Sequence, residues 1–75
     1  MPVVHRGSNW TINIYADDHG VPHFHVRTPD GEAVVAITTL TILAGAVSPR
    51  TMTDVQTWAA DHKDLLLARW QELNG

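Results

Sequence analysis

The order of apolar and polar residues changes once along the chain, from a repeat of two to steps of three and four. Over residues 10–16 apolar and polar side chains alternate, which places Trp10, Ile12 and Ile14 on one face of an extended strand. Residues 22–28 alternate in the same way. We therefore expect two strands whose apolar faces contribute to one core.

Turn residues separate these strands from each other and from those that follow. The segment 17–21 holds Asp and Gly residues, and so short a connection favours an antiparallel hairpin. The sequence Pro29-Asp30-Gly31 predicts a second turn, because proline presets φ and glycine tolerates a positive φ. Two further strands are expected over 32–37 and 40–43, the last of them ending by Gly45.

A helical pattern occupies the rest of the chain. Ser48 can cap the first free amides, and Pro49 suits the first helical position. One helix face then recurs in steps of three and four, at Val55, Trp58, Ala59, His62, Leu65, Leu66, Trp70 and Leu73. The pattern predicts one long amphipathic helix over 48–73. Because His62 lies within the apolar stripe, we expect its ring to bond a backbone carbonyl.

Together these elements predict an α+β fold in the order ββββα. A small antiparallel sheet of three to four strands, over residues 9–43, would carry the long C-terminal helix on one face. The length of 75 residues is typical of a single domain, 1–75. A chain of this size buries only about 60% of its unfolded surface, and without cysteine it has no disulfide or thiolate zinc site. These properties favour a histidine-held metal ion or a partner chain as added support, although well-packed domains of this size also fold unaided.

The charge and hydropathy of the chain disfavour two classes of function. The net charge is −3 and the five Lys and Arg residues are scattered, so we do not expect this chain alone to bind nucleic acid. The uncharged stretch 33–47 has 15 residues, too few to span a membrane. The start of the chain lacks the pattern of a secretory signal. The cytoplasm is therefore the expected location.

The segment 18–25 holds the residues best suited to bind a metal ion or another ligand. His23 and His25 are two apart on an expected strand, so both rings leave the same side of the sheet, about 6.5–7 Å apart at the backbone. Both imidazoles can then bind one divalent ion, with His19 and Asp18 from the turn as third and fourth ligands. Imidazole and carboxylate groups suit zinc, iron, nickel or copper ions.

Three interpretations of this cluster stay open at this point. It binds a metal ion such as Zn²⁺; it binds another ligand or a protein; or it only fixes the turn, with Asp18 holding one ring in a single tautomer. No nucleophile motif or phosphate-binding loop accompanies it. We therefore expect no catalytic residue and no enzyme, with metal-dependent hydrolysis at an interface between chains as the alternative.

The same residues resemble a family of small bacterial proteins, the domain-of-unknown-function family 4160. Its members have an Asp-His-x-Pro-Pro-His-Phe-His-Val core, found here over 18–26 with Val21 in place of the first proline. The similarity covers residues 6–73 and includes Gly45, Trp58, His62, Leu65 and Trp70. It implies a single-domain cytosolic protein without an assigned reaction. As an alternative, it implies a partner-binding component of a two-gene module similar to toxin–antitoxin pairs.

The predicted function is an accessory or interaction module that presents a ligand or metal site. Its residues are Asp18, His19, His23 and His25. A small sheet covered by a helix on one face leaves its second face and two edges exposed. We therefore expect the chain to form a homo-oligomer or to pair with another small protein.

Overall fold

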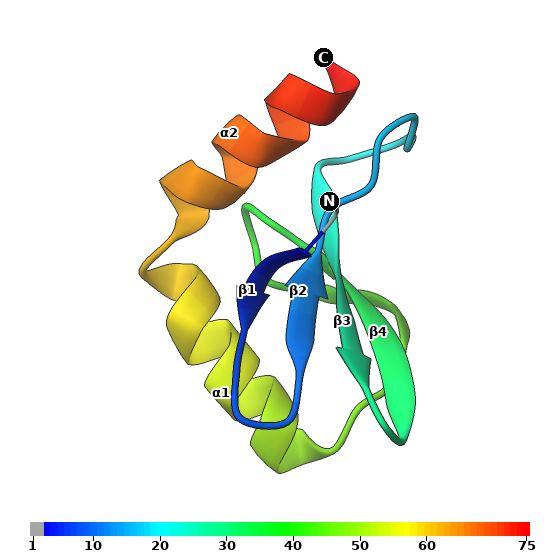
Figure 1. Cartoon of the computed structure of the whole chain (residues 1–75), viewed down its shortest axis with the longest axis vertical. Helices are drawn as coiled ribbons and strands as arrows, with labels where there is room; N and C mark the ends of the chain where they lie inside the picture. Colours follow the sequence, from blue (N-terminus) through cyan, green and yellow to red (C-terminus); the bar gives the residue numbers. More distant parts are fainter. Residues whose placement is uncertain (1–2) are drawn as a thin grey trace.

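The computed structural model describes residues 3–75, which form an antiparallel sheet followed by two helices (Figure 1). The five strands lie in the sheet in chain order: β1 (Val3–Arg6), β2 (Thr11–Asn13), β3 (His23–Thr28), β4 (Gly31–Ala36) and β5 (Ile42–Gly45). The helices are α1 (Pro49–Ala60) and α2 (Lys63–Asn74). The predicted α+β class is confirmed.

The core lies between one face of the sheet and the helices. α1 runs beside the sheet and α2 continues past one end of it (Figure 1). The largest fully buried side chains come from the sheet, the connections next to it and both helices: Ile12, Ile14, Phe24, Val26, Val35, Ile37, Val55 and Leu66. Burial of these side chains supplies most of the driving force for folding. The alternation expected over 22–28 is therefore present, with Phe24 and Val26 in the core.

The sheet has one strand more than the three to four expected. The additional strand, β1, contains two adjacent valines and no alternation, so its sequence carries no strand pattern. It pairs antiparallel with β2 and places His5 opposite Ile12, with an irregularity between Val3 and His5. The sheet consequently runs from Val3 to Gly45 instead of over 9–43.

The single helix expected over 48–73 is two helices of 12 residues each. The first begins as predicted, since Ser48 Oγ accepts from the amide of Thr51 at 3.2 Å. The chain leaves the helical conformation at His62, whose φ is −132° and ψ 26°. The Nδ1 atom of His62 donates to the carbonyl of Trp58 at 2.7 Å and so satisfies one of the last carbonyls of α1. This is the backbone bond expected of His62.

The sequence pattern does not predict the break between α1 and α2, because the apolar positions keep their spacing of three and four across it. Only the polar run of residues 61–64 indicates the interruption.

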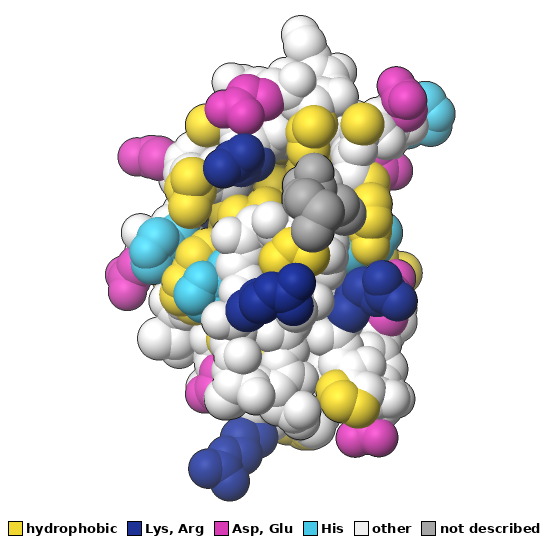
Figure 2. All heavy atoms as spheres, viewed as in Figure 1, with side chains coloured by type: hydrophobic (Ala, Val, Ile, Leu, Met, Phe, Trp, Pro, Cys, Tyr) yellow, Lys and Arg dark blue, Asp and Glu magenta, His cyan; other side chains and the backbone are white. Residues whose placement is uncertain are grey.

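Within the described chain, neither helix has the length and apolarity that a bilayer crossing requires. On the face that Figure 2 shows, the Lys and Arg side chains lie apart from one another among acidic and apolar ones.

Candidate metal centre

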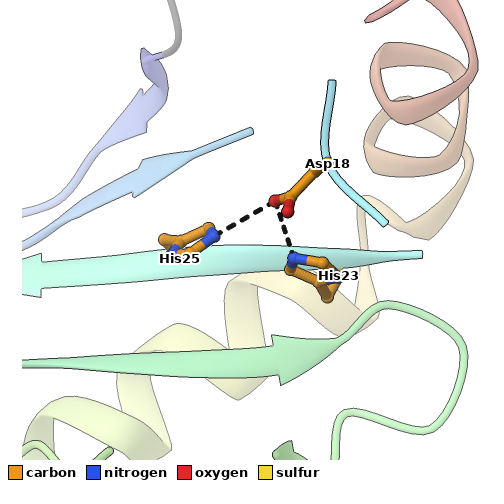
Figure 3. A group of neighbouring side chains, drawn as sticks. All are labelled: Asp18, His23 and His25. Carbon is orange, nitrogen blue, oxygen red and sulfur yellow. Dashed lines mark hydrogen bonds and ion pairs between the residues drawn. The ribbon is translucent and has the colours of Figure 1, made fainter. Parts of the chain in front are cut away.

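Asp18, His23 and His25 meet near one end of the sheet, on the face opposite α1 (Figure 3). The histidines belong to the first half of β3, and Asp18 belongs to the loop between β2 and β3. The Oδ2 atom of Asp18 lies 2.8 Å from Nε2 of His23 and 3.4 Å from Nε2 of His25. One ligand atom from each residue lies within 4.8 Å of the other two. Three of the four predicted site residues are thus brought together.

His19, the fourth predicted residue, lies outside this group. Its side chain is exposed, and its ring is not one of the converging groups. Only its backbone amide reaches the site, where it donates to Oδ1 of Asp18 at 3.2 Å. The donor set in this structure is therefore two imidazoles and one carboxylate.

Both ring nitrogens of His23 face oxygen atoms that can only accept. Nδ1 lies 2.8 Å from the carbonyl oxygen of Val21 and must carry a proton to donate to it. Nε2 lies 2.8 Å from the carboxylate of Asp18. If Nε2 held only a lone pair, two electron-rich atoms would repel each other at this distance. A proton or a metal ion must therefore lie between His23 and Asp18.

His25 has the same orientation as His23, with Nε2 toward Asp18. Its Nδ1 atom is buried and has no hydrogen-bond partner among residues 3–75. The carboxylate of Glu32 on β4 lies 3.5 Å from this nitrogen, slightly beyond a good hydrogen bond. The ring of Tyr15 packs edge-on against the imidazole, with centroids 4.8 Å apart. His25 is thus held in place by packing and has a carboxylate behind it.

The carboxyl group of Asp18 is stabilised in its charged form. Partial burial opposes ionisation, but hydrogen bonds from His25 and His23, the charge of His23 and the amide of His19 outweigh it. The pKa of Asp18 consequently lies below its ordinary value of 3.8. At neutral pH the group is an anionic ligand.

The loop that carries Asp18 is shaped by two residues with positive φ. Asp17 has a φ of 60° and Gly20 a φ of 87°. Glycine adopts this conformation without steric penalty, and aspartate tolerates it better than most residues. The loop turns back over β3, so that Asp18 points at the two histidines (Figure 3).

The end of α2 braces this loop from the other side. The side chain of Asn74 accepts from the amide of Asp18 at 2.7 Å and donates to the carbonyl of Tyr15 at 3.0 Å. The ring of Trp70 lies 4.8 Å from that of His23. The site is therefore built from the sheet, the loop and the last helix.

Sequence reasoning missed two residues that support the site, Glu32 and Asn74. A signal for Glu32 existed, because the tight turn after Thr28 sets the register that places Glu32 opposite Arg27, diagonal to His25. No local signal existed for Asn74. An asparagine at the end of a helix is ordinary for a cap, and only the tertiary fold brings it to the loop.

The donor set and its spacing fit a first-row transition-metal ion. Two ligands bound about 2.1 Å from a tetrahedral zinc ion are about 3.4 Å apart. The separation of His25 and Asp18 equals this value, and that of His23 and Asp18 is about 0.6 Å shorter. Two imidazoles disfavour Mg²⁺ and Ca²⁺, which prefer oxygen ligands.

Comparison with known proteins identifies the family. The sequence model described as "Domain of unknown function (DUF4160)" matches residues 9–71, a range that contains Asp18, His23 and His25. No curated protein and no solved structure gives a match. Because the match covers most of the chain, the family expected from the sequence is confirmed, and the chain belongs to the DUF4160 family.

Proposed function

We propose that this protein is a metal-binding module that holds one divalent first-row transition-metal ion between Asp18, His23 and His25. The observation that carries the proposal is the placement of His23 between two acceptors, each 2.8 Å from a ring nitrogen. A metal ion on Nε2 removes the repulsion and leaves Nδ1 free to donate to Val21. A proton would do the same, so the test must separate the two.

The surroundings of both rings are those expected of metal-binding histidines. Each histidine directs Nε2 to the same carboxylate oxygen and Nδ1 to another oxygen, of Val21 for His23 and of Glu32 for His25. Histidines that bind metals commonly have a carbonyl or carboxylate behind the second nitrogen, which fixes the tautomer and raises the basicity of the ligand. His23 has this bond to Val21, whereas Glu32 lies 3.5 Å behind Nδ1 of His25 without a hydrogen bond to it.

Three protein ligands leave a coordination position open. A four-coordinate ion would complete its shell with water or with a group from a bound molecule. The side chains of His23, His25 and Asp18 are 10%, 19% and 30% exposed, so the site is shielded but reachable from solvent. The module would therefore present the ion to a ligand instead of enclosing it.

Calorimetric titration of tag-free, chelator-treated protein with Zn²⁺ tests the proposal. We expect one ion per chain and a rise in the free energy of unfolding of about 2.7 kcal/mol when free Zn²⁺ exceeds Kd a hundredfold. His25→Ala and Asp18→Asn should each weaken binding by more than about tenfold, because each removes one ligand or its charge. His19→Ala is the matched control and should bind as the wild type does, since the His19 ring lies outside the group.

Two results would overturn the proposal. One is a wild-type protein that binds none of Zn²⁺, Co²⁺, Ni²⁺ or Cu²⁺; the converging groups would then be held together by a proton. The other is binding that His25→Ala and Asp18→Asn leave unchanged, which would place the ion elsewhere. Circular dichroism of each variant separates lost binding from lost fold.

The exposed edge of the sheet favours a second candidate function, self-association. Among residues 3–75, β5 is bonded to β4 alone, and all four of its residues are exposed. Ile42 is 46% and Leu43 49% exposed. Natural edge strands are commonly protected by charged residues or proline, and residues 33–48 contain neither. Two β5 strands paired around a two-fold axis would therefore face each other without like charges.

Light scattering on a size-exclusion column tests this second function. We expect the mass of two chains, and we expect Leu43→Lys to yield a single chain. Leu73→Lys is the matched control, since Leu73 is an exposed leucine (39%) on α2, away from the edge. A wild-type protein with the mass of one chain at every concentration would reject pairing through β5, and loss of the dimer in Leu73→Lys would place the interface on α2.

A further inference from the structure

Asn74, the last residue of α2, holds the loop that carries Asp18. Its Oδ1 atom accepts from the backbone amide of Asp18 at 2.7 Å, and its Nδ2 atom donates to the backbone carbonyl of Tyr15 at 3.0 Å. Both polar atoms of the side chain are thus bonded to the same loop, at two points along it. These bonds join residues 56 and 59 positions apart in the chain.

Asn74 reaches Asp18 through the backbone and leaves the carboxylate free. It is therefore not a ligand, but it determines where the Cα atom of Asp18 lies, and so whether Oδ2 reaches both imidazoles. The loop needs such support, because Asp17 adopts a left-handed conformation that is unfavourable for a residue with a side chain.

A second contact from α2 acts on the strand that carries the histidines. Trp70 lies four residues before Asn74, hence on the same helix face, and its ring is 4.8 Å from that of His23. One face of the last two turns of α2 thus touches both halves of the site, the loop through Asn74 and the strand through Trp70.

We propose that Asn74 is a positioning residue for the metal ion and that metal binding is coupled to docking of the last turn of α2. The proposal rests on the proposed metal-binding function. Coupling of this kind is reciprocal: if docking of the helix end strengthens binding of the ion, the ion strengthens docking by the same factor. Zn²⁺ should therefore stabilise α2 although no residue of α2 is a ligand.

Titration of Asn74→Ala with Zn²⁺, at a temperature where the variant is fully folded, measures the first half of this coupling. We expect Kd to rise about tenfold, as when partners of metal ligands are removed. Gln71→Ala is the matched control, because Gln71 is exposed in the same turn of α2. Within residues 3–75 its side chain makes no hydrogen bond to the loop that carries Asp18. A purely structural role would lower the free energy of unfolding and leave the Kd of the folded protein unchanged.

Hydrogen exchange measures the second half. In the wild type, Zn²⁺ should slow exchange of the Asp18 amide and of the amides at the end of α2; in Asn74→Ala the protection of α2 should disappear. If the wild type binds no Zn²⁺, the metal-binding function fails, and this inference fails with it. If the wild type binds while Asn74→Ala shows the same Kd and the same protection, the coupling alone is refuted.

Discussion

Nε2 of His23 lies 2.8 Å from Oδ2 of Asp18, while the opposite ring nitrogen already donates to the carbonyl of Val21. An imidazole held in this way has no neutral tautomer that satisfies both neighbours. It needs a cation on the side of Asp18, and the negative charge of that residue favours one.

Acid should remove the contribution of Asp18 to stability. Its pKa is lowered in the fold, because hydrogen bonds from His25 and His23 outweigh the effect of burial. The unfolded chain therefore takes up the proton first, so the carboxylate stabilises the fold above its ordinary pKa of 3.8 and loses this effect as the pH falls below it. In metal-free urea unfolding, the stability difference between wild type and Asp18→Asn should shrink from about pH 5 to about pH 2. A difference that persists at the lowest pH would contradict the lowered pKa.

Trp70 should report the arrival of a metal ion. Of the three tryptophans, Trp70 is the one whose ring lies against a proposed ligand, His23, whereas Trp58 stacks on His5 and His62. A divalent charge on His23 changes the electric field at the neighbouring indole. We expect Zn²⁺ to alter tryptophan emission in the wild type and in Trp58→Phe, but not in Trp70→Phe. A signal that follows Trp58 instead would place the ion near the helix break.

Glu32→Gln should weaken metal binding with little change in stability. The substitution keeps the size of the side chain but removes the negative charge 3.5 Å from Nδ1 of His25, which makes that imidazole a weaker ligand. Because the distance is long, we expect a loss near the lower end of the range for such partners, about tenfold in Kd. The pair of Arg27 and Glu32 is exposed and should contribute less than about 1 kcal/mol to folding. An unchanged Kd would show that Glu32 does not act on His25.

Alanine substitutions at Gly45 and Gly20 should lower the free energy of unfolding by different amounts. Both have positive φ, 73° and 87°, but a Cβ atom on Gly45 would collide with the carbonyl oxygen of Glu32, while one on Gly20 would have open space. We expect Gly20→Ala to lower the free energy of unfolding by about 1 kcal/mol and Gly45→Ala by about 2 kcal/mol or more. Equal losses in chemical denaturation would mean that β5 moves to relieve the collision.

The fold could be predicted where burial repeats at a regular interval. Ile12 and Ile14, and then Phe24 and Val26, alternate with polar residues, so each pair marked the buried face of an extended segment. β1 could not be found in this way, because Val3 and Val4 are adjacent and the strand lies at the edge. The break at His62 was also hidden, since it keeps the helical spacing of the apolar residues on either side.

The site was predictable to the extent that strand geometry determines it. His23 and His25 had to share a face because they are two apart, and the short loop kept Asp18 within reach of them. Whether the ring of His19 joined them depended on the rotation of the turn, which the positive φ of Asp17 and Gly20 sets. The contributions of Asn74 and Trp70 depend on where a helix docks, and no local pattern contains that information.

The hydrogen bond between Asp18 and Asn74 closes a loop of more than fifty residues, and this has a consequence for the order of events in folding. Contacts between distant residues form only after the entropy of closing the chain between them has been lost. A binding place that depends on such a contact is an outcome of folding and cannot serve as its nucleus. An ion added to the unfolded chain should leave the refolding rate unchanged. It should slow unfolding, because it binds only after folding is complete.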